Sequence, residues 1–186
     1  MPSSAIQLIV EEHQALATVM RALRHAVEHA RKSGTAPDFD ELRAMLFYLD
    51  EVPARVHHAT ESELLFPRIR ERCPALRPVL DRLEAEHGRG ESSVRDLEHA
   101  LGAWQVMGDG RREAFELLLA AYTEGYLGHM EVEENYVLPV AQDYLSAADW
   151  RELDAALTRQ RGALLDTLSR GHQQLYERIL AGQAPT

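Results

Sequence analysis

The chain has 186 residues, of which 45% are hydrophobic and 27% charged, and this composition fits one soluble domain with a well-buried core. Its formal net charge of −10 argues against a nucleic-acid partner, because a phosphate-binding surface needs an excess of Lys and Arg. The single cysteine, Cys73, excludes an intrachain disulfide and a cysteine-rich zinc site. We find no secretory signal and no apolar run long enough to cross a lipid bilayer. We therefore expect a cytoplasmic protein that has no membrane partner.

Five long amphipathic segments follow one another along the chain, each with apolar residues recurring at helical spacing. They cover residues 4–32, 39–71, 76–106, 111–144 and about 147–180. Pro53 should kink or unwind the second helix one turn before His57, and Tyr136 falls on the inner stripe of the fourth. The sequence therefore predicts an all-α fold, an antiparallel four-helix bundle of about residues 4–144 with an additional C-terminal helix, in one domain of residues 1–186.

Two copies of one motif lie in this pattern, each a histidine followed four residues later by a glutamate and then by a proline. The copies are His57, Glu61 and Pro67, and His129, Glu133 and Pro139. Upstream of each copy stands another histidine directly after a glutamate, His13 or His87. Such internal repetition indicates two halves that fold against each other.

The repeated residues suit a metal centre. Residues four apart lie on one helical face, so each His-x3-Glu pair can reach one point, and the upstream histidines add a nitrogen from each remaining helix. Four imidazoles and two carboxylates exceed the ligand set of a structural zinc site and suit two first-row ions bridged by the carboxylates. We expect non-haem iron, with other divalent metals as alternatives. The predicted metal ligands are His13, His57, Glu61, His87, His129 and Glu133.

Other residues near the motif are weaker candidates for metal ligands. No catalytic residue is assigned apart from the metal centre. A single histidine on an apolar face is usually a core residue, but six metal-binding side chains in phase favour a metal site. His58 lies about 100° round the helix from His57, which favours the surface or an outer shell over a ligand role. Tyr126, one turn before His129, could hydrogen-bond a bridging carboxylate or a bound gas.

The six positions and the two motif copies, with their Leu-Phe-Pro and Val-Leu-Pro tails, resemble the hemerythrin-like, HHE cation-binding family over about residues 5–145. The resemblance implies a di-iron centre bridged by oxo or hydroxo and by Glu61 and Glu133. It implies that the four histidines are terminal ligands, two on each iron. It also implies chemistry with a small diatomic gas, O2 or NO, or with peroxide.

One position departs from the oxygen-carrying members of that family. They have a fifth histidine one turn after the third-helix ligand, where this chain has Glu91. Glu91 is a possible additional ligand, an outer-shell acceptor or a structural residue. An open iron position or a harder anionic ligand would favour the ferric state, which argues against simple oxygen transport. Similar four-histidine relatives are associated with NO handling and iron–sulfur repair, peroxide removal and iron sensing.

Three functions follow from these observations. The first is a di-iron redox protein, an enzyme or a binder, that acts on O2, NO or peroxide and takes electrons from an unknown donor. The second is a non-catalytic module that binds, senses or stores iron or another divalent ion. The third is a structural bundle whose histidines pair with glutamates. The fifth helix lacks the motif, so we expect it outside the bundle or at the contact of a homodimer.

Overall fold

The computed structural model describes residues 4–52 and 57–167, and the regular elements within them are all helices. This confirms the predicted all-α helical bundle. The expected kink at Pro53 and the end of the predicted fifth helix beyond residue 167 lie outside the described residues. None of the described helices contains a stretch long and apolar enough to cross a lipid bilayer.

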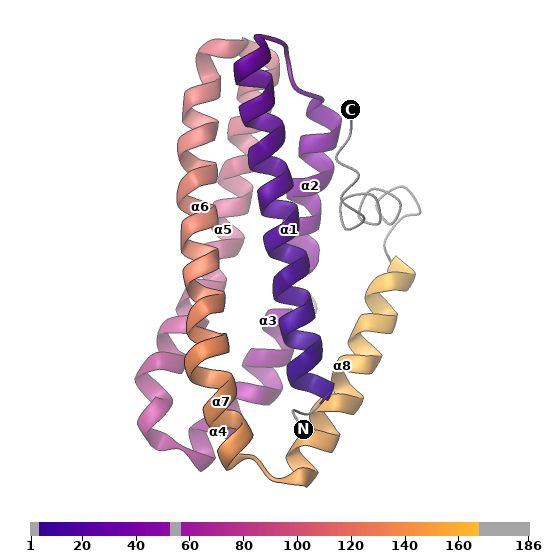
Figure 1. Cartoon of the computed structure of the whole chain (residues 1–186), viewed down its shortest axis with the longest axis vertical. Helices are drawn as coiled ribbons and strands as arrows, with labels where there is room; N and C mark the ends of the chain where they lie inside the picture. The colour runs from indigo at the N-terminus through magenta and orange to yellow at the C-terminus, as the bar shows by residue number, and fades with distance from the viewer. Residues whose placement is uncertain (1–3, 53–56, 168–186) are drawn as a thin grey trace.

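Four columns of helix run alternately up and down, and a further helix lies beside them (Figure 1). The first column is α1 (Ser4–Ser33), and the third is α5 (Arg77–Met107). The second contains α2 (Phe39–Val52), α3 (His58–Thr60), a π-helical turn (Glu61–Leu65) and α4 (Phe66–Arg72). The fourth contains α6 (Arg112–Val132), a π-helical turn (Glu133–Val137) and α7 (Leu138–Tyr144). Short 3₁₀ turns at Pro74–Leu76 and Asp109–Arg111 precede α5 and α6, and α8 (Ala147–Thr167) follows α7.

Side-chain caps mark helix starts that the sequence predicted. Asp38 Oδ1 accepts the backbone N–H groups of Asp40 (3.0 Å) and Glu41 (3.1 Å) at the start of α2. Before α8, Ser146 and Asp149 bond reciprocally, with the Ser146 N–H donating to Asp149 Oδ2 (2.9 Å) and the Asp149 N–H donating to Ser146 Oγ (3.2 Å). These bonds satisfy backbone donors that have no partner within the helix itself.

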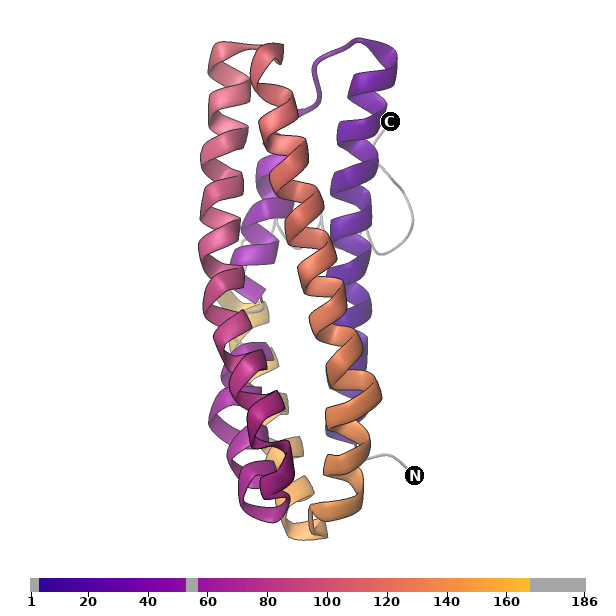
Figure 2. The same cartoon turned by 90° about the vertical axis from the view of Figure 1, so that its left-hand side faces the viewer.

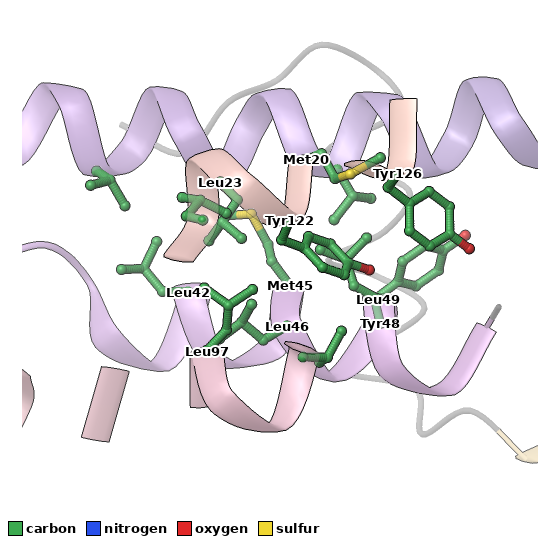
Figure 3. Close-up of a cluster of buried hydrophobic side chains, with 14 of the residues drawn as sticks. Met20, Leu23, Leu42, Met45, Leu46, Tyr48, Leu49, Leu97, Tyr122 and Tyr126 are labelled. Atoms are coloured by element: carbon green, nitrogen blue, oxygen red, sulfur yellow. The ribbon is translucent and has the colours of Figure 1, made fainter. Parts of the chain in front are cut away.

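Two apolar clusters stack along the bundle. In one, Met20 and Leu23 of α1 pack with Met45 of α2, Leu97 of α5 and Tyr122 of α6 (Figure 3). The other joins α1, α4, α5, α7 and α8 towards the opposite end of the columns (Figure 2). Its buried side chains include Ile9, Phe66, Leu80, Leu138, Leu153 and Leu157. Because α8 contributes to this cluster, its apolar face is buried against the bundle from outside.

A π-helical turn interrupts the second and fourth columns at equivalent places. The N–H groups of Phe66 and Leu138 donate to the carbonyls of Glu61 and Glu133, five residues earlier. In both columns a proline follows at once, and proline cannot donate the bond that an ordinary α-turn needs at its position. The wider turn shifts the buried face by one residue. The prediction that Tyr136 lies on the inner stripe is therefore wrong, since its side chain is 63% exposed.

Candidate metal centre

The structure brings the six predicted ligands to one buried region between the two apolar clusters, although they lie on four separate columns. Each of the six residues is at most 5% exposed. His13 lies on α1, His57 immediately before α3, His87 on α5 and His129 on α6, and Glu61 and Glu133 begin the two π-helical turns.

The six residues form two overlapping sets of possible ligands. One set is His13, His57, Glu61 and Glu133, and the other is Glu61, His87, His129 and Glu133. Within each set, the ligand atoms all lie within 4.8 Å of one another. Both glutamates belong to both sets, whereas each histidine belongs to one. This is the arrangement that two neighbouring ions need if two carboxylates bridge them.

Each of the four imidazoles is held from outside through its Nδ1 atom. The pairs are His13 with Glu134 (2.8 Å), His57 with Glu12 (3.2 Å), His129 with Glu86 (3.0 Å) and His87 with Ser62 (3.3 Å). A carboxylate beside Nδ1 accepts a hydrogen bond from the Nδ1–H group, and this tautomer directs the unprotonated Nε2 inward. Outer carboxylates of this kind orient histidine ligands and make them more basic.

The inward nitrogens meet in pairs. His13 Nε2 lies 2.9 Å from His57 Nε2, and His87 Nε2 lies 3.1 Å from His129 Nε2. If both nitrogens of a pair carry only lone pairs, they repel each other unless a proton or a cation lies beside both. The outer carboxylates favour this state for His13, His57 and His129, and Ser62 can accept a hydrogen bond from Nδ1 of His87 in the same tautomer, so each pair is suited to a cation.

The two central carboxylates also lack ordinary partners. Within the described residues, none of the four oxygens of Glu61 and Glu133 accepts a hydrogen bond of good geometry. Nitrogens do lie close: His129 Nε2 is 3.0 Å from Glu133 Oε1, and His57 Nε2 is 3.5 Å from Glu61 Oε2. Buried carboxylate oxygens without hydrogen-bond donors are costly, whereas a metal ion would satisfy them. The residues present therefore fit a pair of divalent cations.

A family model for the hemerythrin HHE cation-binding domain matches residues 4–141. The chain belongs to this family. The match confirms the resemblance predicted from the two motifs, and it includes all six residues of the buried centre. Searches of curated proteins and of solved structures found no match. Together, hemerythrin-family membership and the two sets of His and Glu side chains indicate metal binding.

In this hemerythrin-family centre the two glutamates have opposite pKa shifts. Burial, followed by repulsion from Glu133, raises the pKa of Glu61 well above its ordinary value. Burial would raise the pKa of Glu133 as well, but the nearby nitrogens of His129, His13 and His87 outweigh burial and hold it well below the usual range. Glu133 therefore loses its proton more readily than Glu61 in the metal-free protein, and binding of two divalent ions would displace any proton that the pair retains.

We expect Glu61→Gln to stabilise the metal-free protein at neutral pH, because burial raises the pKa of Glu61 and glutamine removes the cost of ionising this carboxyl. The effect should be absent below the ordinary carboxyl pKa of 4.5 and should grow as the pH rises. A raised folded-state pKa contributes stability at low pH that is lost as the pH rises through it, and glutamine cannot ionise. Urea unfolding at stepped pH measures the difference. Glu63→Gln, at an exposed position of the same turn, is the control, and an effect independent of pH would contradict the prediction.

Sequence reasoning did not identify Glu12 and Glu86 as outer carboxylates that hold histidine ligands. The sequence signal was the Glu-His dipeptide that occurs before each copy. The glutamate of each dipeptide does not bond the histidine beside it in the sequence. Glu12 contacts His57 rather than His13, and Glu86 contacts His129 rather than His87. Adjacent helical residues point in different directions, so each glutamate reaches the histidine of the next column.

We expect Glu12→Ala to weaken metal binding at the His13–His57 pair by about 10–100-fold, the usual effect of removing an outer partner. The loss of the carboxylate frees the His57 ring to rotate and lowers its basicity. Competition with a chromophoric chelator measures the affinity. Glu11→Ala, at the exposed neighbouring position on α1, is the matched control. Equal affinities for the two variants would show that the Glu12–His57 contact does not support the site.

His58 lies inside the hemerythrin-family bundle, so the surface alternative for it is wrong. Its side chain is 5% exposed, and its ring stacks on His87 with centroids 3.9 Å apart. His58 Nε2 lies 2.9 Å from the Tyr126 hydroxyl, which therefore bonds this imidazole instead of a bridging carboxylate. Burial lowers the pKa of His58 and raises the pKa of Tyr126, so both side chains are neutral.

Glu91 does not join the centre. It is half-buried and belongs to neither set of ligands, so the structure does not support the prediction of an additional ligand at this position. The stacked ring of His58 instead packs directly against His87. The ligand set around His87 and His129 thus consists of these two histidines and the two central glutamates, as does the set around His13 and His57.

Proposed function

We propose that this protein holds a non-haem di-iron centre that reacts with O2, NO or a peroxide. The observation that carries the proposal is the sharing of Glu61 and Glu133 between two pairs of histidines. Two ions held in this way each receive two nitrogens and two bridging oxygens. Iron accepts further ligands beyond these four, so each ion would keep room for a small molecule or a bridging oxygen atom.

The donor types support iron over the alternatives. Imidazole and carboxylate together suit iron, whereas soft metals prefer the sulfur ligands that this centre lacks. A structural zinc site closes with four ligands of its own, while here two carboxylates serve both positions. When bound, iron would supply one-electron redox steps and Lewis acidity.

The protein's own groups would then orient and protect the centre. Glu12, Glu86 and Glu134 hold three imidazoles with Nε2 inward, and the apolar clusters on both sides keep water out. Low local polarity strengthens the attraction between the ions and the two glutamates. Storage or sensing of iron needs the same ligands but no access for a reactant. A cavity that reaches His87 and His129 favours a reactive centre.

Anaerobic loading with ferrous iron tests the proposal. We expect about two irons per chain, and separate additions of O2, NO and hydrogen peroxide should each be followed by optical spectroscopy. At least one of them should produce absorption typical of a bridged ferric pair, and this absorption should bleach on reduction. Less than one iron per chain, or no spectral change with any of the three, would contradict the proposal. The same loading is carried out with His57→Ala, which lacks one of the predicted ligands. His25→Ala, at an exposed position of α1, is its control.

A further inference from the structure

A cavity of about 350 Å³ lies between α5 and α6. It exists partly because both helices have glycines on the facing surfaces, Gly90 on α5 and Gly125 on α6. A Cβ atom at Gly125 would meet nothing within 4 Å, and one at Gly90 would come no closer than 3.9 Å, to the ring of Tyr126. The two helices thus leave space between them without loss of backbone contact.

The cavity is too large for a diatomic gas alone. A water molecule takes about 30 Å³ of the liquid, so the space is roughly ten times the size of a gas molecule or a hydrogen peroxide molecule. Pockets that bind small organic ligands begin at about 300 Å³. The volume therefore points to a reactant with a carbon skeleton.

The lining is apolar on the α6 side, and it is polar on the α5 side, where Glu86, Arg89, Ser93 and Asp96 lie, and at the inner end. Leu118, Ala121 and the ring of Tyr122 supply the apolar wall. His58 and Tyr126 supply polar groups where the cavity reaches the centre, and their bond of 2.9 Å fixes both rings. His58 Nδ1 is buried and has no hydrogen-bond partner among the described residues. A ligand that fits would carry an apolar body and a polar end that faces these two rings.

Only one half of the centre meets this cavity. His87 and His129 line it, whereas His13 and His57 do not. The same half has the weaker outer shell, because Ser62 holds His87 at the position where the repeat has Glu134 for His13. The two halves therefore differ in their outer support, and a reactant in this cavity meets the His87–His129 position.

We propose that the cavity admits a small organic hydroperoxide, polar end inward, to the His87–His129 side of the centre. This inference rests on the proposed function. Reduction breaks the O–O bond, consumes two electrons and two protons, and gives an alcohol and water. The two electrons would be supplied by the pair of ferrous ions that the six ligands would hold, and the two protons would come from bulk solvent at the cavity mouth. An electron donor can transfer electrons across several ångströms and does not need to reach the metal ligands, whereas the hydroperoxide does. A cavity that extends to the ligands therefore suits the hydroperoxide.

Binding of a redox-inert product tests this directly. The probe is 2-phenyl-2-propanol, the alcohol formed from cumene hydroperoxide, titrated into the zinc-loaded protein by calorimetry or by ligand-observed NMR. We expect saturable binding at one site per chain. Gly125→Leu should weaken binding about tenfold or more, because its side chain enters the cavity without displacing the backbone. Gly128→Leu lies on the same helix, outside the cavity lining and with open space around its Cβ, so it is the matched control.

The iron-loaded protein gives a second measurement. Gly125→Leu should lower the ratio of kcat/KM for cumene hydroperoxide to that for hydrogen peroxide by about tenfold, and Gly128→Leu should leave this ratio unchanged. Absence of saturable binding to the wild type, or equal losses in both variants, would overturn the inference. Saturable binding of a hydroquinone at this site without any binding of the alcohol would overturn it in favour of a reductant.

The metal content separates this failure from failure of the proposed function. Two zinc ions per chain without binding of the alcohol would overturn the organic hydroperoxide and leave the di-metal centre standing. Loss of metal binding together with retained binding of the alcohol to the metal-free protein would overturn the reaction itself, and with it this inference.

Discussion

Glu133→Ala should abolish binding of both metal ions, whereas His129→Ala should abolish binding of one. Glu133 belongs to both sets of ligands, and its oxygens lie 3.3 Å from His13 Nε2 and 3.0 Å from His129 Nε2. Its removal takes a ligand from each ion and the bridge between them. Removal of the His129 ring leaves the His13–His57 set complete. We expect affinity losses of the order of 100-fold or more at each ion in Glu133→Ala, since each lost charged ligand costs several kcal/mol.

Elemental analysis after desalting measures the number of bound ions. The expected values are two per chain in the wild type, about one in His129→Ala and near zero in Glu133→Ala. Glu131→Ala, at an exposed position of the same column, should retain two. One tightly held ion in Glu133→Ala would show that the carboxylate does not bridge, and the shared-ligand arrangement would then have to be abandoned.

Metal removal should lower the melting temperature by about 10–20 °C. Each ion present at 100 times its dissociation constant stabilises the fold by about 2.7 kcal/mol. In a domain of this size each kcal/mol shifts the melting temperature by roughly 2–4 °C. Within the described part of the chain, the metal-free centre also keeps buried carboxylates without hydrogen-bond partners, which are costly.

Differential scanning calorimetry before and after dialysis against a chelator measures this shift. His129→Ala, with one remaining ion, should show roughly half of it, and His25→Ala should show all of it. An unchanged melting temperature on chelation would mean that the histidines and glutamates are a structural network that needs no metal.

The fold could be predicted because helical spacing is a local property. Residues on one face of each segment are apolar, and the breaks at Ser33-Gly34 and Gly108-Asp109-Gly110 mark the turns. The four columns and the additional helix follow from this pattern. The six metal-binding side chains could be nominated for the same reason, since His-x3-Glu places both side chains on one face.

Other features needed the packed structure. The π-helical turns depend on how each column accommodates its proline while keeping Glu61 and Glu133 inward, and they turn Tyr136 outward. The burial of His58 depends on its stack against His87 from another column. The cavity depends on two glycines that lie on different helices.

The sequence by itself determined which residues would face inward and which of these could bind metal, because a regular helix has a fixed period. Only the tertiary structure decided that both carboxylates serve two pairs of histidines, and that Glu12 supports His57 rather than its neighbour His13. It also decided that the His87–His129 pair lines a cavity that the His13–His57 pair does not line. These features are distances between separate columns, and such distances are set by side-chain packing, which no spacing within one helix specifies.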